Sequence, residues 1–271
     1  MSAGSMAEGK ETWSLLLDLK LAAIFLTRLP LTLPQDPPPG AVARATWCFP
    51  LIGFLIGALA AAVFLLAGAL ALSPWLAAVL ALATGLLLTG CLHEDGLADM
   101  ADGFGGGWTR ERKLEIMRDS RLGTYGAAAL ITSLALRAGA LASLPTPEAA
   151  ALVLVMAQGL SRAPLSFFMQ ATPLARQDGQ SGSAGRPRRQ VALAALAVGL
   201  ASLLVLLALL PWGLHDRLVL GLLVLSLLSL MFLVLRWLTK RQIGGYTGDV
   251  LGGLQQVNEI ALLLLAAAYL A

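Results

Sequence analysis

Residues 49–72 read FPLIGFLIGALAAAVFLLAGALAL and contain no charged side chain. A helix that crosses a bilayer needs about 20 consecutive, predominantly apolar residues, so this stretch alone predicts a transmembrane helix. Six further runs of comparable character follow it, at residues 74–92, 123–144, 147–170, 190–211, 215–238 and 250–271. We therefore predict an all-α membrane protein with about seven transmembrane helices.

The composition of the whole chain supports this interpretation. Of the 271 residues, 58% are hydrophobic and only 13% are charged, whereas soluble domains carry about 25% charged residues. The net charge of +3 reflects basic residues in the loops and does not indicate nucleic-acid binding. The two cysteines do not suggest a disulfide framework, and we expect them to pack as small apolar residues.

The N-terminal part differs from the apolar runs. Residues 13–29 are apolar but carry three charged side chains, which favours a helix lying in the membrane interface and argues against a cleavable signal peptide. Residues 30–40 are rich in proline and predict a linker. We expect a single polytopic membrane domain over residues 1–271, with the interfacial helix and linker within 1–48 and a polar active-site segment at 93–122.

The basic residues predict the orientation in the membrane. Nearly all of the 19 Lys and Arg residues fall in the N-terminal segment or in the loops after the second, fourth and sixth runs. The exceptions are Arg217 on the opposite side and Arg137 and Arg162 inside runs. The positive-inside rule then places the N-terminus in the cytoplasm and the C-terminus outside, and the regular alternation favours seven spans over six or eight.

An acidic segment follows the second run at residues 90–103, GCLHEDGLADMADG. Asp95, Asp99 and Asp102 are spaced i, i+4, i+7, so they share one face of a helix and repel one another unless a cation compensates them. Oxygen-rich sites suit Mg²⁺ or Mn²⁺, which predicts a metal site at the cytoplasmic membrane edge. His93 and Glu94 are candidates for a general base. A solvated acidic face is the alternative, but the interleaved small and apolar residues favour packing against other helices.

Several arginines near this segment are candidate ligands for phosphate. Arg118 and Arg121 are i, i+3 neighbours, and guanidinium groups bind phosphate oxygens in a bidentate manner, so the pair is interpreted as a clamp on a diphosphate. Topological anchoring is the alternative. Arg162 lies inside an apolar run, where an arginine normally faces a cavity or a partner, and we expect it to face the interior of the site. Arg137 has two alternative roles: it faces the interior of the site in the same way, or it forms a structural pair with Glu259.

A second polar segment begins the last run, at residues 240–259. If Asp249 starts a helix, then Gln256 and Glu259 continue from it as a polar seam that leads from the cytoplasmic edge and contributes to the site. The glycines in this segment permit a close approach of another helix. Hydrogen bonding between helices is the alternative role. The polar loop at 176–185 is expected to be either a lid or a linker.

These motifs together resemble the cobalamin synthase family over nearly the whole chain. The resemblance rests on TRLP at 27–30, FPLIG at 49–53, HEDGLADMADG at 93–103, MRDSRLGTYG at 117–126, the pair at 161–162, and GGYTGDVLGG at 244–253 followed by Glu259. Thr247 of the last motif joins the candidate substrate-binding residues. The order and spacing of several motifs make the resemblance specific, whereas the short D-G-x-A-D element alone would be weak.

The resemblance implies a reaction. Adenosylcobinamide-GDP and α-ribazole, or α-ribazole 5′-phosphate, would combine to give adenosylcobalamin, or its 5′-phosphate, and GMP, with Mg²⁺ as the cofactor. It further implies a multi-pass protein of a bacterial or archaeal cytoplasmic (inner) membrane, with the active site facing the cytoplasm. A homo-oligomer, or association with other corrinoid-pathway enzymes, is also expected.

Two other functions are weighed against this one. A secondary transporter would carry ionisable groups near the bilayer midplane and often an inverted repeat, but this chain carries its acidic residues at the membrane edge and shows no repeat. A membrane diphosphate transferase of the CDP-alcohol phosphotransferase type would need an arginine where Asp99 stands.

Overall fold

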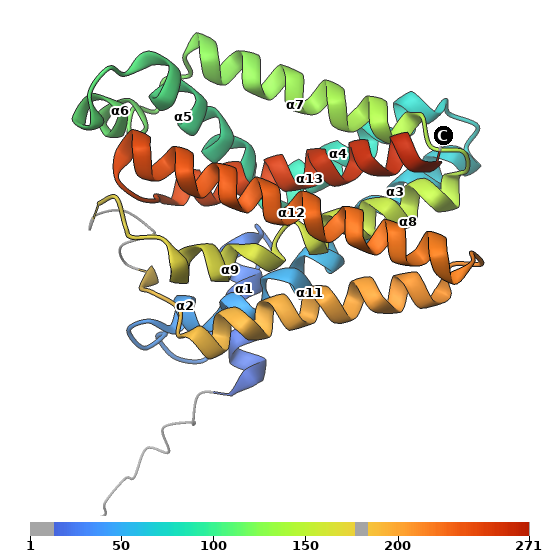
Figure 1. Ribbon diagram of the computed structural model, residues 1–271, viewed down its shortest axis with the longest axis horizontal. Coiled ribbons are helices and arrows are strands. Elements are labelled where there is room, and N and C mark those ends of the chain that lie inside the picture. The colour runs from blue at the N-terminus through green and yellow to red at the C-terminus, as the bar shows by residue number, and fades with distance from the viewer. Residues whose placement is uncertain (1–13, 177–183, 271) are drawn as a thin grey trace, which may run out of the picture.

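The computed structural model describes residues 14–176 and 184–270, and its regular structure there is helical, with one isolated parallel bridge between Leu174 and Tyr246 (Figure 1). The helices are α1 (Leu15–Leu26), α2 (Ala41–Ala45), a 3₁₀ turn (Thr46–Cys48), α3 (Phe49–Ala69), α4 (Pro74–Thr89), α5 (Leu92–Gly106), α6 (Arg110–Ile116), α7 (Thr124–Ala142), α8 (Pro147–Leu160), α9 (Ala163–Ala171), α11 (Arg189–Leu209), α12 (Leu214–Ile243) and α13 (Gly248–Leu270). The predicted all-α class is confirmed. Most of the polar loop at 176–185 lies outside the described residues.

Six of the described helical stretches are long and apolar enough to cross a membrane. They are Ala41–Ala69, Thr124–Ala142, Pro147–Ala171, Arg189–Leu209, Leu214–Ile243 and Gly248–Leu270. A seventh span exists only if α4 and α5, which meet at an angle of 90°, cross as one broken unit. The prediction of about seven spans is confirmed, except that the second span is bent between α4 and α5.

The bend between α4 and α5 has a local cause. Gly90 and Cys91 both adopt left-handed backbone conformations, with φ of 61° and 59°. Two consecutive residues in that region end a right-handed helix and redirect the chain. As a result α4 has only 16 residues, about 24 Å at 1.5 Å per residue, and the acidic segment starts a helix of a new direction.

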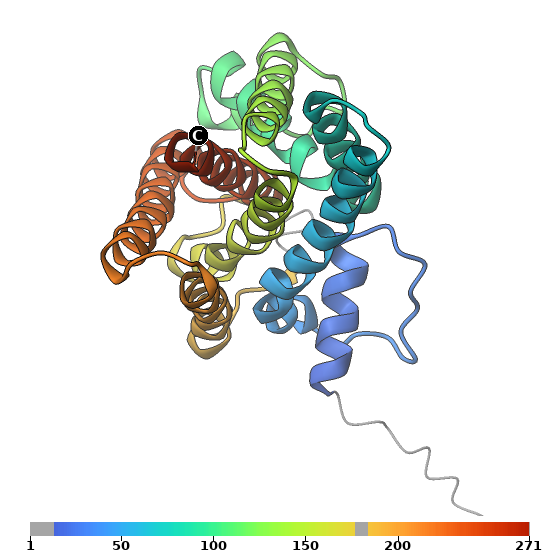
Figure 2. The ribbon, with the colours of Figure 1, turned by 90° about the vertical axis from the view of Figure 1, so that its right-hand side faces the viewer.

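Helix α1 lies across the direction of the long helices, as Figures 1 and 2 show together. With 12 residues it is about 18 Å long and too short to span a bilayer. Its buried Asp18 accepts hydrogen bonds from Arg44 Nε at 3.0 Å and from Trp47 Nε1 at 3.3 Å, which fix α1 against the start of the first span. This geometry is consistent with the interfacial helix expected over residues 13–29.

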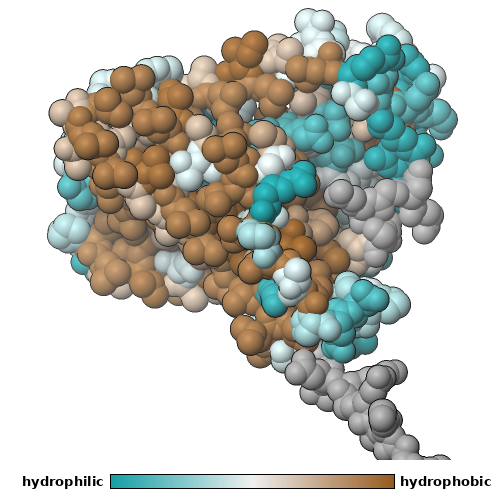
Figure 3. All heavy atoms as spheres, turned by 180° about the vertical axis from the view of Figure 1, so that it is seen from behind, coloured by the Kyte–Doolittle hydropathy of each residue, from teal (hydrophilic) through white to brown (hydrophobic). Residues whose placement is uncertain are grey.

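The outer surface separates into two zones (Figure 3). Hydrophobic side chains cover most of the face in view, and hydrophilic side chains gather at the end of the bundle that carries α5 and α6. Large apolar residues of α12 such as Leu222 and Leu233 are well exposed, which suits contact with lipid. Small residues bring spans together inside: a Cβ on Gly57 of α3 would lie 2.7 Å from Val155 Cα of α8.

Candidate active site

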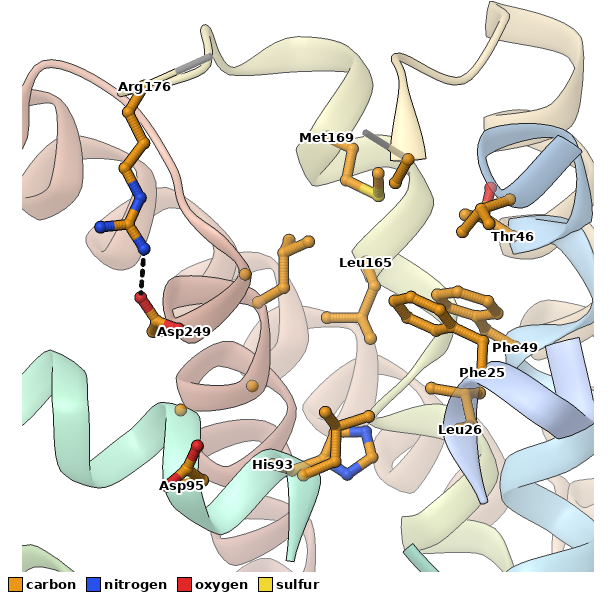
Figure 4. Close-up of a pocket in the computed structure, with 17 residues that line it drawn as sticks. Phe25, Leu26, Thr46, Phe49, His93, Asp95, Leu165, Met169, Arg176 and Asp249 are labelled. Carbon is orange, nitrogen blue, oxygen red and sulfur yellow. Dashed lines mark ion pairs between the residues drawn. The ribbon is translucent and has the colours of Figure 1, made fainter. Parts of the chain in front are cut away.

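A cavity of about 230 Å³ lies at the polar end, where α5 and α13 meet α1, α9 and the start of the first span (Figure 4). One part of its wall is apolar, and the aromatic rings of Phe25 and Phe49 stack there with centroids 5.8 Å apart. The other part is polar. The labelled polar side chains that line the cavity are Thr46, His93, Asp95, Arg176 and Asp249.

The acidic part of the cavity combines α5 with α13. Asp95 projects from the first turn of α5 and Asp249 from the first turn of α13, and both line the cavity. Thr247 donates its Oγ1 hydrogen to Asp249 Oδ2 at 3.0 Å and accepts from Val250 N at 3.4 Å, so it orients the carboxylate and caps the helix. Asp99 is half-buried one turn further along α5, and both Asp95 and Asp249 interact with it electrostatically.

Glycine contacts bring the two acidic helices together. A Cβ on Gly96 would lie 2.8 Å from Asp249 O and 3.2 Å from Gly252 Cα, which is closer than ordinary packing allows. The backbones of α5 and α13 therefore touch at this crossing. Because Gly96 directly follows Asp95, the same contact that joins the helices brings Asp95 to the side of Asp249. The close helix approach expected at the glycines of residues 240–259 is confirmed for Gly252.

The three aspartates of α5 do not share one environment. Asp102 is buried, and its carboxylate accepts hydrogen bonds from Gly123 N and Gly126 N, each at 2.8 Å, at the start of α7. It occupies two of the N–H groups that the first turn of a helix leaves unsatisfied. Among the residues described, no three His, Cys, Asp or Glu side chains form a group that would hold a metal ion.

The donor chemistry at the cavity still fits magnesium. Mg²⁺ commonly binds through only one or two protein carboxylates and completes its shell with water and substrate phosphates. Asp95 and Asp249 offer such carboxylates, and Asp99 is close to them. The cavity leaves room beside them for a phosphate-bearing ligand.

Glu94 points away from this cavity into a buried polar network. Arg137 Nη1 of α7 lies 3.1 Å from Glu94 Oε1 and 3.3 Å from Glu259 Oε1. Gln256 Nε2 donates to the same Glu94 oxygen at 2.9 Å, and Gln255 Nε2 donates to Glu259 Oε2 at 2.8 Å. Of the two roles left open for Arg137, the structure has the pair with Glu259. The seam expected along α13 is real, but from Gln256 onward it joins helices and does not line the larger cavity.

Arg162 belongs to the same buried region. It lies at the break between α8 and α9, is 1% exposed, and donates from Nη1 to Gln158 O at 2.7 Å and Gln158 Oε1 at 2.6 Å. With Glu94 and Arg137 it lines a second, much smaller cavity. Only His93 of the candidate catalytic and binding residues lines both cavities, so Arg162 faces the interior but not the larger cavity.

Arg118 and Arg121 lie outside the cavity. Arg121 is 87% exposed in its side chain and forms a 2.6 Å ion pair with Asp119, two residues away. This guanidinium holds the pKa of the Asp119 carboxyl down to about 2. Arg118 is also exposed. The segment between α6 and α7 is not helical, so the i, i+3 spacing does not form the expected helical pair.

Comparison with known proteins adds an independent observation. Residues 18–267 match the family model described as Cobalamin-5-phosphate synthase. The chain belongs to the cobalamin-5-phosphate synthase family. Proteins named adenosylcobinamide-GDP ribazoletransferase are similar to it: the one from Bradyrhizobium diazoefficiens is 50% identical over 97% of this chain and 98% of its own, and the one from Mesorhizobium japonicum is 46% identical over 93% of each chain. No solved structure matches the chain.

Membership of the cobalamin-5-phosphate synthase family makes the protein a transferase of cobalamin biosynthesis, and confirms the resemblance and the expectation of an enzyme. Sequence reasoning missed two polar residues of the cavity, Thr46 and Arg176. Arg176 was counted only among the basic loop residues that predict topology, yet its guanidinium reaches Asp249 (Figure 4). No motif signalled this, because the contact depends on how the chain after α9 folds back onto α13.

Proposed function

We propose that this transferase joins adenosylcobinamide-GDP to α-ribazole, or to α-ribazole 5′-phosphate, and releases GMP together with adenosylcobalamin or its 5′-phosphate. Family membership and the printed names of the relatives support the reaction class. The observation that carries the assignment to a place in the fold is the pair of carboxylates, Asp95 and Asp249, beside an aromatic wall in one cavity.

The chemistry requires a free ribose hydroxyl of the acceptor to attack the diphosphate phosphorus that carries the cobinamide, with GMP as the leaving group. This hydroxyl is not the 5′ one, because an acceptor with a 5′-phosphate keeps that phosphate in the product. Such transfers are catalysed mainly by positioning and by neutralisation of charge. Asp95 and Asp249, with Asp99 close by, would hold Mg²⁺, which when bound supplies the positive charge that the diphosphate needs. The stacked rings of Phe25 and Phe49 offer a flat apolar surface for the aromatic base of α-ribazole.

His93 is the better of the two candidate bases. Its side chain lines the cavity, whereas Glu94 is engaged by Arg137 and Gln256. A general base must come within hydrogen-bond reach of the proton it removes, so we propose that His93 accepts the proton of the attacking hydroxyl. Thr247 keeps the Asp249 carboxylate in its orientation throughout.

We further propose that the protein lies in the cytoplasmic (inner) membrane with the N-terminus and the cavity on the cytoplasmic side. The distribution of Lys and Arg among the loops supports this orientation, and so does the gathering of hydrophilic side chains at the cavity end (Figure 3). A homo-oligomer or an association with other corrinoid-pathway enzymes stays a prediction.

One assay tests the proposed reaction. Membranes carrying the protein are incubated with adenosylcobinamide-GDP, Mg²⁺ and either α-ribazole or its 5′-phosphate, and GMP and the corrinoid product are quantified. We expect equal amounts of GMP and product, loss of both on chelation with EDTA, and a preference between the two acceptors. Membranes that release no more GMP than membranes lacking the protein would overturn the proposal, and uptake of a corrinoid without GMP would indicate a transporter.

A further inference from the structure

Arg176 is the cation at the acidic part of the cavity. Its Nη2 lies 3.5 Å from Asp249 Oδ2, and its Nη1 donates to Leu114 O at 3.3 Å. The side chain is 14% exposed, and its buried Nε has no hydrogen-bond partner among the residues that the structure describes. Figure 4 shows the guanidinium reaching Asp249 from above the cavity. This arginine is therefore only partly satisfied where it stands.

The backbone that carries Arg176 is held firmly. Ala175 N donates to Tyr246 O at 2.9 Å, and Tyr246 N donates to Pro173 O at 2.9 Å, which ties the chain to the turn before α13. Arg110 Nη2 donates to Ala175 O at 2.7 Å and adds a third attachment. Arg176 thus begins from a fixed backbone position, and only its long side chain is free to change partner.

The local charges favour such a change. The carboxyl group of Asp99 has those of Asp95 and Asp249 and the guanidinium of Arg176 as charged neighbours, so carboxyl groups outnumber cations here. A divalent cation is a stronger partner for a carboxylate oxygen than a guanidinium at 3.5 Å, because its charge is larger and its approach is closer. A cation on Asp249 would therefore compete with Arg176 for the same oxygen and repel the guanidinium.

A guanidinium released from Asp249 needs another anion, and a diphosphate provides it. Arginine binds phosphate oxygens with two parallel N–H donors, and its unpartnered Nε would supply one of them. Resting on the function proposed above, we infer that Arg176 binds the diphosphate of the substrate by exchanging partners. It leaves Asp249 when a divalent cation takes that carboxylate, and it then holds the phosphates beside the cation.

This exchange has an unusual consequence for Arg176→Gln. Removal of the competing guanidinium is expected to strengthen cation binding severalfold. Loss of charge-assisted hydrogen bonds to phosphate is expected to raise the KM for the diphosphate substrate roughly tenfold or more. A residue that only supports the fold would weaken both when removed.

The experiment uses the full-length protein in detergent or liposomes. Mn²⁺ binding is measured by electron paramagnetic resonance in the absence of substrate, and the KM for adenosylcobinamide-GDP is measured by GMP release. Arg112→Gln is the matched control, since Arg112 is an exposed arginine of α6 paired with Glu115, and we expect neither quantity to change there. Arg176→Lys retains the charge without the planar fork, so Mn²⁺ affinity should stay near that of the wild type while the KM rises.

The outcomes separate this inference from the proposed function. A wild-type protein that releases no GMP contradicts the function, whatever the variants do. A wild type that turns over normally, with Arg176→Gln binding Mn²⁺ no more tightly or keeping the wild-type KM, overturns the partner exchange alone. If Arg176→Gln fails to fold, Arg176→Lys decides, because an unchanged KM in that variant is equally contradictory.

Discussion

Substitution of Arg137 by methionine tests the buried network that joins three helices. Arg137 of α7 pairs with Glu94 of α5 at 3.1 Å and with Glu259 of α13 at 3.3 Å. The side chains are 3% exposed for Arg137, 10% for Glu94 and 1% for Glu259. Arg137→Met would fill similar space but leave two carboxylates inside the bundle without their shared cation.

The expected cost is large. Removing one partner of a buried ion pair destabilises a protein by about 3–5 kcal/mol, because the remaining charge is left uncompensated. Arg162 cannot replace the lost cation without giving up its hydrogen bonds to Gln158. A double variant, Arg137→Met with Glu259→Gln, removes one of the stranded charges and should recover part of the loss. The double-mutant cycle would then show positive coupling.

Unfolding of the purified protein is followed by tryptophan fluorescence during titration with sodium dodecyl sulfate in mixed micelles. Arg188→Met is the control, because Arg188 is exposed before α11 and its loss should change the free energy of unfolding by less than about 0.5 kcal/mol. A free energy of unfolding for Arg137→Met within about 1 kcal/mol of the wild type would refute the reasoning, because a loss of that size is no larger than that of one ordinary hydrogen bond. The reasoning would also be refuted if the destabilisation of the double variant equalled the sum of the destabilisations of the two single variants.

Three further predictions concern the site. Gly96→Ala would press a Cβ to 2.8 Å from Asp249 O, so we expect a loss of about 1–3 kcal/mol in unfolding free energy and slower GMP release; Gly68→Ala, which meets open space, should change neither. Asp102→Ala should cost about 1 kcal/mol through the lost contacts to α7 and leave Mn²⁺ affinity unchanged, whereas weaker Mn²⁺ binding would restore it as a metal ligand. Arg121→Ala should leave the KM for adenosylcobinamide-GDP unchanged because its ion pair is exposed, and a raised KM would restore the predicted clamp.

The sequence was most informative where one-dimensional patterns decide the structure. Apolar runs predicted the spans because a bilayer imposes a fixed length on a helix. They did not reveal the bend after α4, because two left-handed residues interrupt that run without changing its hydropathy. The helical period correctly placed Asp95 and Asp99 near one another. It could not indicate that α7 begins beside Asp102 and takes up its carboxylate.

The candidate arginines also show that spacing in the sequence does not reveal tertiary contacts. Spacing alone suggested that Arg118 and Arg121 act together, but the chain there is not helical and Arg121 pairs with its neighbour Asp119. Arg162 was expected to face the interior of the site, but its side chain is taken up by Gln158 one turn earlier. Glu94, a candidate general base, is instead paired with Arg137 of α7, which lies far from it in the sequence. Arg176 reaches the cavity only because a short bridge attaches its backbone to the turn before α13. Such tertiary contacts carry no signal in local sequence.

The most direct test of the account is the GMP release of Asp249→Asn. This substitution keeps the shape of the side chain in the cavity but removes the negative charge that we propose binds the cation. We expect the rate to fall at least about tenfold, as for the loss of groups that hold a metal site, while Asp216→Asn on the exposed first turn of α12 keeps the wild-type rate. Wild-type GMP release by Asp249→Asn, with unchanged dependence on Mg²⁺, would contradict the assignment of this cavity as the active site.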